Sequence, residues 1–361
     1  MGASLRRLGI SFEILEQADA VGHSWRNHYE RLHLHTAKSL SALPHFPFPK
    51  AYPRYPSRQQ IVDYLESYAQ AFDLKPHFQS SVNDAKHVDG HWEVTVEGQE
   101  KPWESRFLVI ATSYNGDPKR PQWPGEEGFK GQIIHSRDYR NAEPFQGQDV
   151  LIVGLGNTGG EIALDLHEHG ARPSVALRSP IHVMPRQMFG LPIQVFSIIL
   201  SQLPNSWVDF IGLKLAKLRM GDMTKFGLDR PKLGPATMVR EHGRIPLIDI
   251  GTVDMIRAGH LPIYKNIKEF EEDCVVFEDG QKKPFDTVLL CTGYRARIDK
   301  VFSKAEELIN EKGYPNWHGV EVPLPGYEGL YFLGFSNPIA GALRQIRKEA
   351  LGIAKSIAMA I

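Results

Sequence analysis

The sequence is poor in cysteine and has no excess of either charge. Two of its 361 residues are cysteines, Cys274 and Cys291, which is too few for a disulfide framework. A reducing compartment suits such a chain, so we expect a cytoplasmic protein. Acidic and basic residues number 42 each. The net charge of zero gives no electrostatic reason to expect nucleic acid or an anionic membrane as a partner.

Long apolar runs and metal-binding patterns are also missing. The most apolar run, residues 191–200, is too short to span a bilayer, and Pro204 follows it closely. We therefore expect no transmembrane segment. The sequence has no zinc-ligand spacing and no catalytic-triad signature, so it predicts no metal site and no protein nucleophile.

Predicted strands alternate with predicted helices along the chain, which indicates an α/β fold with parallel sheets. Apolar residues at helical spacing predict an amphipathic helix over residues 58–72. The continuous apolar run within 106–114 is typical of a strand buried on both faces. Residues 12–16 predict a short strand that ends in Glu16. At 361 residues the chain is long enough for two domains.

A glycine motif follows one apolar strand and precedes a helix. Gly154, Gly156 and Gly159 form G-x-G-x-x-G, with Asn157 and Thr158 between the last two glycines. In dinucleotide-binding folds the first glycine makes the tight turn, the second lets the backbone approach pyrophosphate, and the third lets helix and strand pack closely. The amino end of the helix then offers amide groups to phosphate. We expect these five residues to bind a nicotinamide cofactor.

The strand after this helix ends near Arg178, where an NAD-binding protein usually carries an acid. An arginine pairs well with a 2′-phosphate. The sequence therefore favours NADPH over NADH. A glycine turn needed only for packing is the alternative interpretation.

A proline-containing insertion at about 186–240 is predicted to be helical or irregular. Its apolar stretch from Phe189 to Leu218 suits buried core, a substrate lid or a membrane-surface contact. We expect core, with a lid as the next choice.

Several stretches resemble one known family. FKGQIIHSRDY, residues 129–139, resembles the F-x-G-x-x-x-H-x-x-x-[FY] signature of the flavin-containing monooxygenases. VGHSW (21–25), LLCTGY (289–294) and GLYFLGF (329–335) are similar to stretches that lie near the flavin in that family. The order and spacing agree over essentially the whole chain from residue 4. Within the family, the chain is most similar to the YUCCA-type branch.

The resemblance implies two Rossmann-like dinucleotide-binding domains. The NADPH-binding domain, 147–285, would be inserted into a discontinuous FAD-type domain made of 1–146 and 286–361. The implied activity is an FAD- and NADPH-dependent monooxygenation through a flavin C4a-(hydro)peroxide. O2 and a small organic molecule would be the substrates. The reaction would be N- or S-oxygenation, or oxidative decarboxylation of an aromatic 2-oxo acid.

The resemblance also assigns site residues. Glu16, Trp25, Thr292 and Gly293 would contact FAD. His35 occupies the place of a polar residue set beside the oxygenated flavin, where it would hydrogen-bond the peroxide. A histidine that satisfies backbone groups is an equally good interpretation of His35.

The chain departs from the family at the FAD site. Family members begin with a strand and a second G-x-G-x-x-G loop, which hold the FAD pyrophosphate, and neither is present here. Two interpretations stay open: an N-terminally truncated monooxygenase, or a non-catalytic NADP(H)-binding remnant that has lost FAD. We expect the first, and we expect this polypeptide to bind FAD weakly or not at all.

Overall fold

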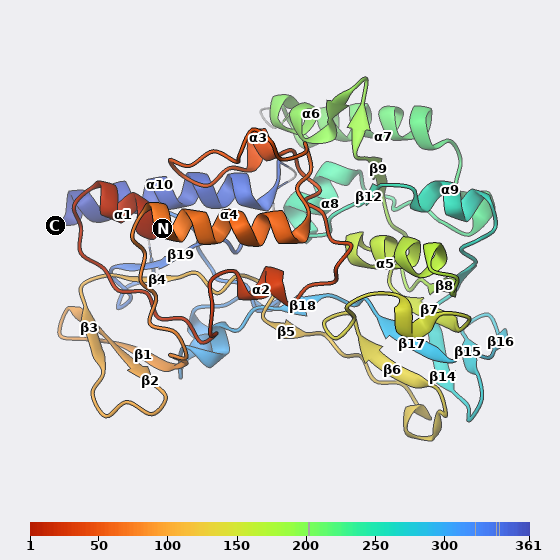
Figure 1. The fold of residues 1–361 in the computed structure, drawn as a ribbon, viewed down its shortest axis with the longest axis horizontal. Helices are drawn as coiled ribbons and strands as arrows, with labels where there is room; N and C mark the ends of the chain where they lie inside the picture. Colours follow the sequence, from red (N-terminus) through yellow and green to blue (C-terminus); the bar gives the residue numbers. More distant parts are fainter. Residues whose placement is uncertain (201–202, 322, 337, 339) are drawn as a thin grey trace. The chain divides into compact units, whose positions relative to one another are not determined.

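The computed structural model describes residues 1–200, 203–321, 323–336, 338 and 340–361 (Figure 1). Helices and strands alternate along the chain, so the expected α/β class is confirmed. The chain divides into two compact units. Unit 1 comprises Met1–Arg26, Ala37–Asp117 and Tyr294–Ile361, and unit 2 comprises Asn27–Thr36 and Pro118–Gly293.

The units are defined by contacts within the chain, whereas the expected domains were defined by the nucleotide that each would bind. The assignment of a cofactor to each domain therefore stays a prediction. One short segment, Asn27–Thr36, belongs to unit 2 although the residues on both sides of it belong to unit 1. This segment carries His35.

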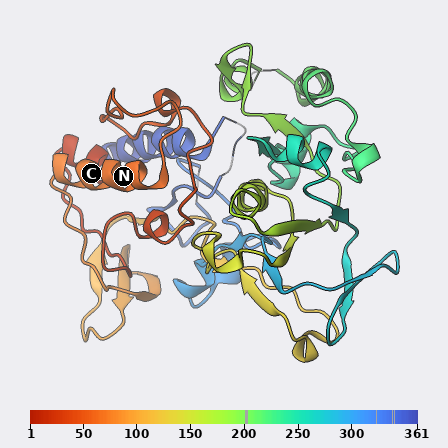
Figure 2. The same ribbon diagram turned by 45° about the vertical axis from the view of Figure 1, so that its right-hand side comes forward.

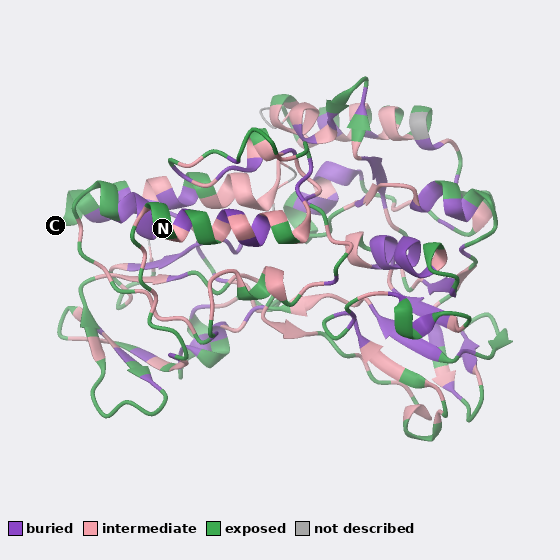
Figure 3. Ribbon diagram, viewed as in Figure 1, coloured by how far each residue is buried: buried purple, intermediate pink, exposed green. Residues whose placement is uncertain are grey.

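Unit 2 is built on a five-stranded parallel sheet with the strand order β13-β8-β7-β17-β6. Its strands are β6 (Gln132–His135), β7 (Asp149–Val153), β8 (Arg172–Ala176), β13 (Ile263–Tyr264) and β17 (Thr287–Leu290). The inner strand β17 is buried at every residue, as expected for a parallel sheet covered on both faces (Figure 3).

The register of the central strands decides where the loops meet. Val153 at the end of β7 is paired with Ala176 of β8 and with Leu290 of β17. Because the strands are parallel, their carboxyl ends share one edge of the sheet. The residues that follow Val153, Ala176 and Leu290 therefore gather at that edge, which is where nucleotides bind in open α/β sheets.

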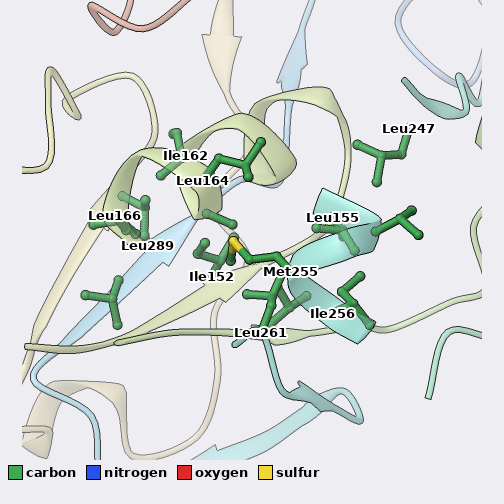
Figure 4. Packing of buried hydrophobic residues seen from close by; sticks show 14 of the residues in the cluster. Ile152, Leu155, Ile162, Leu164, Leu166, Leu247, Met255, Ile256, Leu261 and Leu289 are labelled. Carbon is green, nitrogen blue, oxygen red and sulfur yellow. The ribbon is translucent and has the colours of Figure 1, made fainter. Parts of the chain in front are cut away.

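Helix α5 (Asn157–Glu168) lies beside this sheet (Figures 1 and 2). Ile162 and Leu166 of α5 belong to the same buried cluster as Ile152 of β7 and Met255 of α9 (Thr252–Arg257) (Figure 4). The predicted strand–glycine turn–helix–strand unit is thus confirmed.

Most of the other elements of unit 2 are short, except for helix α7 (Asn205–Met220). They are η1 (Glu126–Gly128), η2 (Glu143–Phe145), β9 (Val183–Pro185), β10 (Gln187–Met188), β11 (Leu191–Pro192), α6 (Ile193–Leu200), α7 (Asn205–Met220), η3 (Thr224–Phe226), α8 (Pro235–His242), β12 (Leu247–Asp249), β14 (Ile267–Phe270), β15 (Val275–Phe277) and β16 (Lys282–Lys283). The insertion at about 186–240 is largely helical or irregular, as predicted, but it also contains the antiparallel strand pair β10–β11, which was not predicted.

The expectation that Phe189–Leu218 forms core is wrong for several of its largest side chains. Phe189 is 77% exposed, Trp207 63% and Leu218 76%. In α6 the polar Gln194 is buried, whereas none of the apolar residues of that helix is. Apolar composition alone predicted burial, but these helices turn much of their apolar surface outward. Residues 201 and 202 of this stretch lie outside the described ranges.

Unit 1 contains an antiparallel sheet of β1 (Val82–Val88), β2 (His91–Val96) and β3 (Trp103–Ser105). It also contains a parallel pair, β4 (Leu108–Ile110) with β19 (Leu330–Phe332). Its helices are α1 (Gly2–Arg7), α2 (His23–Arg26), α3 (Lys38–Ser41), α4 (Arg58–Ala71) and α10 (Ala342–Ala360), with η4 (Ile298–Lys300) and η5 (Ala305–Glu307). The short strands β5 (Asp117–Pro118) and β18 (Tyr294–Arg295) pair where the chain passes between the units.

Helix α4 confirms the helix predicted at 58–72, and its start is encoded locally. The hydroxyl of Ser57 accepts from the amide of Gln60, and the Gln60 side chain accepts from the Ser57 amide. This reciprocal capping box satisfies two amides that the helix itself leaves unpaired. No helix within the described ranges combines the length and apolarity needed to cross a membrane.

The strand expected at 12–16 is wrong, because these residues form only an isolated bridge between Leu15 and His77. A strand needs a neighbour to accept its backbone hydrogen bonds along its length. In the described ranges, strand β4 pairs only with β19, so it does not serve as a neighbour for residues 12–16. Residues 12–16 are therefore not part of a sheet.

Candidate functional site

The glycine turn of unit 2 has the geometry of a phosphate-binding turn. Gly154 follows β7 with a φ of +97°, which favours glycine, and its amide donates to the Ala176 carbonyl at 3.0 Å. A Cβ at Gly159 would lie 2.2 Å from the Gly154 oxygen, so the helix can approach the turn only without a side chain there. The first and third glycines are thus required by the turn itself.

Gly156 is different, because a Cβ built on it would meet no atom within 4 Å. It is exposed and precedes α5 as the N-cap residue, where no side chain caps the helix. The first-turn amides of α5 therefore face open space, and the positive end of the helix dipole points the same way. These residues fit a nucleotide diphosphate.

Asn157 and Thr158 occupy the first turn of α5. The Asn157 side-chain oxygen accepts from the Ile248 amide at 2.7 Å, which ties α5 to β12. The Thr158 hydroxyl opposes the rise in the pKa of Tyr29, so the two side chains lie near each other. The Asn157 side-chain oxygen is engaged within the protein, so the backbone amides of this turn are the groups that suit a phosphate.

Arg178 lies two residues beyond β8 and is exposed. By the register of the sheet it leaves the same edge as the Gly154 turn. A guanidinium at this edge is placed to pair with an anionic group on a nucleotide bound at the turn.

His35 lies in unit 2 beside α5. Its Nε2 is 3.3 Å from Oε2 of Glu161, a carboxylate that is 2% exposed. This is ion-pair distance, but the angle does not suit a hydrogen bond, and Nε2 is buried without one. His35 thus faces a buried carboxylate, not only the backbone groups of the alternative interpretation.

Glu161 receives a second contact from the segment that contains His35. The Tyr29 hydroxyl donates to Glu161 Oε2 at 2.6 Å, and both side chains are buried. Burial, followed by the charge of Glu161, raises the pKa of Tyr29 well above its usual value. Tyr29 therefore remains a hydroxyl donor, which a buried carboxylate needs.

The same face of α5 carries two further acids. Asp165 accepts from the Tyr139 hydroxyl at 2.6 Å, and burial raises the pKa of Tyr139. Glu168 forms a two-pronged ion pair with Arg31, with one N–O distance of 2.8 Å. Acids at positions 161, 165 and 168 recur at helical spacing, so one face of α5 binds residues that lie far away in sequence.

Sequence reasoning missed these tyrosine–carboxylate pairs. The signal that was available is a helix whose buried face contains Glu161 and Asp165 among apolar residues. A buried acid requires a donor. The sequence does not say which of twelve tyrosines supplies it.

Thr292 and Gly293 follow β17. The Thr292 hydroxyl donates to the Lys119 carbonyl, and the Lys119 amide donates to the Gly293 carbonyl at 2.9 Å. Gly293 has a φ of +82°. The pair thus forms a tight turn in which the Thr292 hydroxyl and the Gly293 carbonyl are already hydrogen-bonded within the protein.

Glu16 and Trp25 lie in unit 1. Oε1 of Glu16 accepts from the Ala18 amide at 2.9 Å, and Trp25 is half-buried in α2. The described part of unit 1 contains no glycine turn between a strand and a helix beside Glu16. The residues present therefore fit a nicotinamide nucleotide in unit 2 better than they fit FAD.

No group of three or more potential metal ligands occurs within the described ranges. His135, the histidine of the 129–139 signature, is buried, and its Nδ1 accepts from the Arg137 amide at 3.1 Å. Burial lowers the pKa of His135. This histidine organises the turn after β6.

Comparisons with known proteins agree with this geometry. A family model described as flavin-binding monooxygenase-like matches residues 15–307. The chain is 39% identical to the indole-3-pyruvate monooxygenase YUCCA1 of Oryza sativa subsp. japonica, over 98% of this chain and 87% of the relative. It is 36% identical to a probable indole-3-pyruvate monooxygenase, YUCCA3 of Arabidopsis thaliana, over 99% of this chain and 83% of the relative.

A solved structure extends the agreement to the fold. A mutant flavin monooxygenase from Stenotrophomonas maltophilia matches with a TM-score of 0.75 and 22% identity, over 99% of this chain and 95% of that one. The expected architecture of two Rossmann-like domains is thereby confirmed. The chain belongs to the flavin-binding monooxygenase-like family, on its YUCCA-type branch.

Proposed function

We propose that this chain works as an FAD- and NADPH-dependent monooxygenase on a small organic substrate, with an aromatic 2-oxo acid as the preferred substrate. The observation that carries the proposal is the open glycine turn before α5, with Arg178 leaving the same sheet edge. Membership of the YUCCA-type branch supports the substrate class, since the names of the relatives refer to indole-3-pyruvate.

The nucleotide would be held by groups of unit 2. The diphosphate would accept hydrogen bonds from the first-turn amides of α5, close to Gly156. Arg178 would pair with the 2′-phosphate, which selects NADPH over NADH. Asn157 would hold the turn in shape, because its side-chain oxygen accepts from the Ile248 amide.

FAD would supply the oxygen-activating chemistry when bound. The proposed contacts to it are Glu16, Trp25, Thr292 and Gly293, with His35 as the polar residue beside the reacting atoms. Oxidative decarboxylation then balances as 2-oxo acid, O2, NADPH and one proton giving the shortened carboxylic acid, CO2, water and NADP+.

The test uses the purified chain with added FAD. NADPH consumption is followed with indole-3-pyruvate and O2, and the organic product is identified by mass spectrometry. The proposal predicts indole-3-acetate formed with NADPH as the donor, and a much lower rate with NADH. Binding of NADP+ without any oxidation of NADPH would instead favour the non-catalytic NADP(H)-binding alternative.

A further inference from the structure

The insertion at about 186–240 carries positive charge that the balanced composition of the whole chain conceals. It contains eight lysine and arginine residues and three aspartate and glutamate residues, so its net charge is +5. Because the full chain has 42 residues of each sign, the rest of the chain carries a net charge of −5. One part of unit 2 is therefore basic although the protein as a whole is neutral.

Helix α7 in this insertion exposes apolar and basic side chains together. Trp207, Phe210 and Leu218 are 63%, 57% and 76% exposed, and their helical spacing puts them on one face. Lys214 and Lys217 are exposed on the same face. The ammonium of Lys214 lies 4.3 Å from the centroid of the Phe210 ring, which is a cation–π contact.

The single acidic residue in the sequence of α7 is engaged inside unit 2. Asp209 accepts from the Ala236 amide at 2.6 Å and from the Thr237 hydroxyl, both in the first turn of α8. Its carboxylate therefore serves the amino end of α8. The charged side chains described on the exposed face of α7 are lysines.

Phe189 adds an exposed aromatic ring at the tip of the β10–β11 hairpin. The two residues between the strands, Phe189 and Gly190, have φ values of +50° and +76°. Positive φ at both positions is what a type I′ turn requires, and asparagine or glycine is preferred there. A phenylalanine is strained in this conformation and, at 77% exposed, gains little packing in return. The hairpin thus presents an apolar ring to solvent at a position that suits asparagine better.

Helix α6 follows directly from this hairpin. Its Ile199 is 67% exposed, whereas its polar Gln194 is buried. Figures 1 and 2 both place α6 and α7 at the same margin of unit 2. We call the exposed apolar side chains of the hairpin, α6 and α7, together with Lys214 and Lys217, the α6–α7 surface.

The chemistry of the α6–α7 surface matches the interface of an anionic bilayer. Aromatic and aliphatic side chains enter the boundary between headgroups and acyl chains, while lysines on long stems reach the lipid phosphates. Each lysine near an acidic leaflet adds to the attraction. A second copy of the chain on this surface would bring two basic surfaces together. Nucleic acid would pair with the lysines but leave aliphatic side chains such as Leu218 in water.

We propose that the α6–α7 surface binds the surface of membranes that contain acidic phospholipids. Phe189, Trp207 and Phe210 are the inserting side chains, and Lys214 and Lys217 contact lipid phosphates. Of the three interpretations of the apolar stretch 189–218, this one explains both its exposure and its charge. The inference goes beyond the proposed monooxygenase activity and does not depend on it.

Co-sedimentation with lipid vesicles tests the inference without any turnover. The purified 361-residue chain is mixed with vesicles of phosphatidylcholine alone, or with vesicles that contain about one third phosphatidylserine. We expect most of the chain to pellet with the acidic vesicles and about tenfold less with the neutral ones. The bound fraction should fall as the ionic strength is raised from about 0.1 M to about 0.5 M, because salt screens the attraction.

Three variants weaken the surface in different ways. Phe189→Asn suits the turn, so it should keep or raise the resistance to urea while it lowers vesicle binding about threefold. Trp207→Ser combined with Phe210→Ser should lower binding about tenfold. Lys214→Gln combined with Lys217→Gln should lower binding to acidic vesicles about tenfold and flatten its dependence on salt.

Matched controls change exposed side chains of unit 1. Met359→Ser removes an apolar side chain that is 88% exposed. Lys101→Gln combined with Lys312→Gln removes two exposed lysines. Both controls should keep the wild-type binding, and circular dichroism checks the folding of every variant.

Several outcomes would overturn the inference. The wild type could pellet with neither kind of vesicle, or equally with both, or the controls could lose as much binding as the surface variants. Sedimentation velocity without lipid tests a different occupant. A wild-type dimer that Trp207→Ser with Phe210→Ser makes monomeric would assign the surface to a second copy of the chain and overturn the membrane contact. Phe189→Asn decides the question if the double variants do not fold.

Discussion

Gly156 and Gly159 belong to one sequence pattern but differ in the space around them. A side chain at Gly159 would run into the Gly154 carbonyl, whereas one at Gly156 would enter open space. The same chemical change at the two positions therefore separates the stability of the turn from its use as a binding site.

We expect Gly159→Ala to lower the free energy of unfolding by roughly 1–3 kcal/mol, because the turn and α5 must move apart. Gly156→Ala should leave that free energy almost unchanged and still weaken NADP+ binding about tenfold, because its methyl group occupies the approach of the phosphates. Urea unfolding and calorimetry measure the two effects. Equal stability of the two variants would contradict the assigned roles.

Arg178 offers a second test at the level of one side chain. Arg178→Ala should raise the Kd for NADPH about tenfold and leave the Kd for NADH within about twofold, since the 2′-phosphate is the group that distinguishes them. Arg172→Ala is the matched control, because Arg172 is exposed at the opposite end of β8 and pairs with Asp149. A loss of affinity for both nucleotides would argue against a 2′-phosphate contact.

Cys291 predicts a dependence of stability on alkaline pH. Burial raises the pKa of its thiol from about 9 to about 12. An acid whose folded-state pKa is raised contributes stability below its unfolded pKa and loses it as the pH rises. The free energy of unfolding should therefore fall between pH 9 and pH 12, and it should fall less steeply in Cys291→Ala. Parallel curves for the two proteins would contradict this assignment.

At the scale of elements, the amino end of α5 and one of its faces have different roles. No side chain caps its amino end, and one of its faces holds the buried Glu161 and Asp165 and the more exposed Glu168, all bound to distant side chains. Burying a carboxylate is costly unless it receives hydrogen bonds. The segment Asn27–Thr36 supplies two of the donors, which explains why it belongs to unit 2.

Tyr29→Phe should lower the free energy of unfolding by about 1–3 kcal/mol, because Glu161 loses its 2.6 Å donor while it stays buried. Tyr52→Phe, at a half-buried residue of unit 1, should change the value by less than about 0.5 kcal/mol. Urea unfolding of both variants gives the comparison. A Tyr29→Phe variant as stable as the wild type would contradict the stabilising role assigned to the Tyr29–Glu161 hydrogen bond.

At the scale of the whole molecule, the two expected nucleotide sites are unequal. Unit 2 has a complete glycine turn, whereas Glu16 of unit 1 lies in a segment with a single bridge to His77, and the described residues of unit 1 place no glycine turn beside it. Backbone amides of such a turn are the usual ligands of a dinucleotide's phosphates.

We expect the 361-residue chain to bind NADP+ and to purify with much less than one FAD per chain. Flavin absorbance of the purified protein, before and after addition of FAD, measures this directly. NADP+ calorimetry on the same sample shows that the protein is folded. A stoichiometric yellow protein would contradict the expectation.

The sequence by itself determined the features that depend on neighbouring residues. The glycine spacing at 154–159, the position of Arg178 after β8 and the capping box of α4 are local, since short-range sterics and hydrogen bonding set them. Tertiary structure decided the rest. Residues 12–16 lack a strand because no neighbour pairs along them, and several large apolar side chains between 189 and 218 are exposed because amphipathic burial needs a facing surface. The Tyr29–Glu161 bond joins residues 132 positions apart, and no local pattern encodes a contact whose partner is chosen by packing.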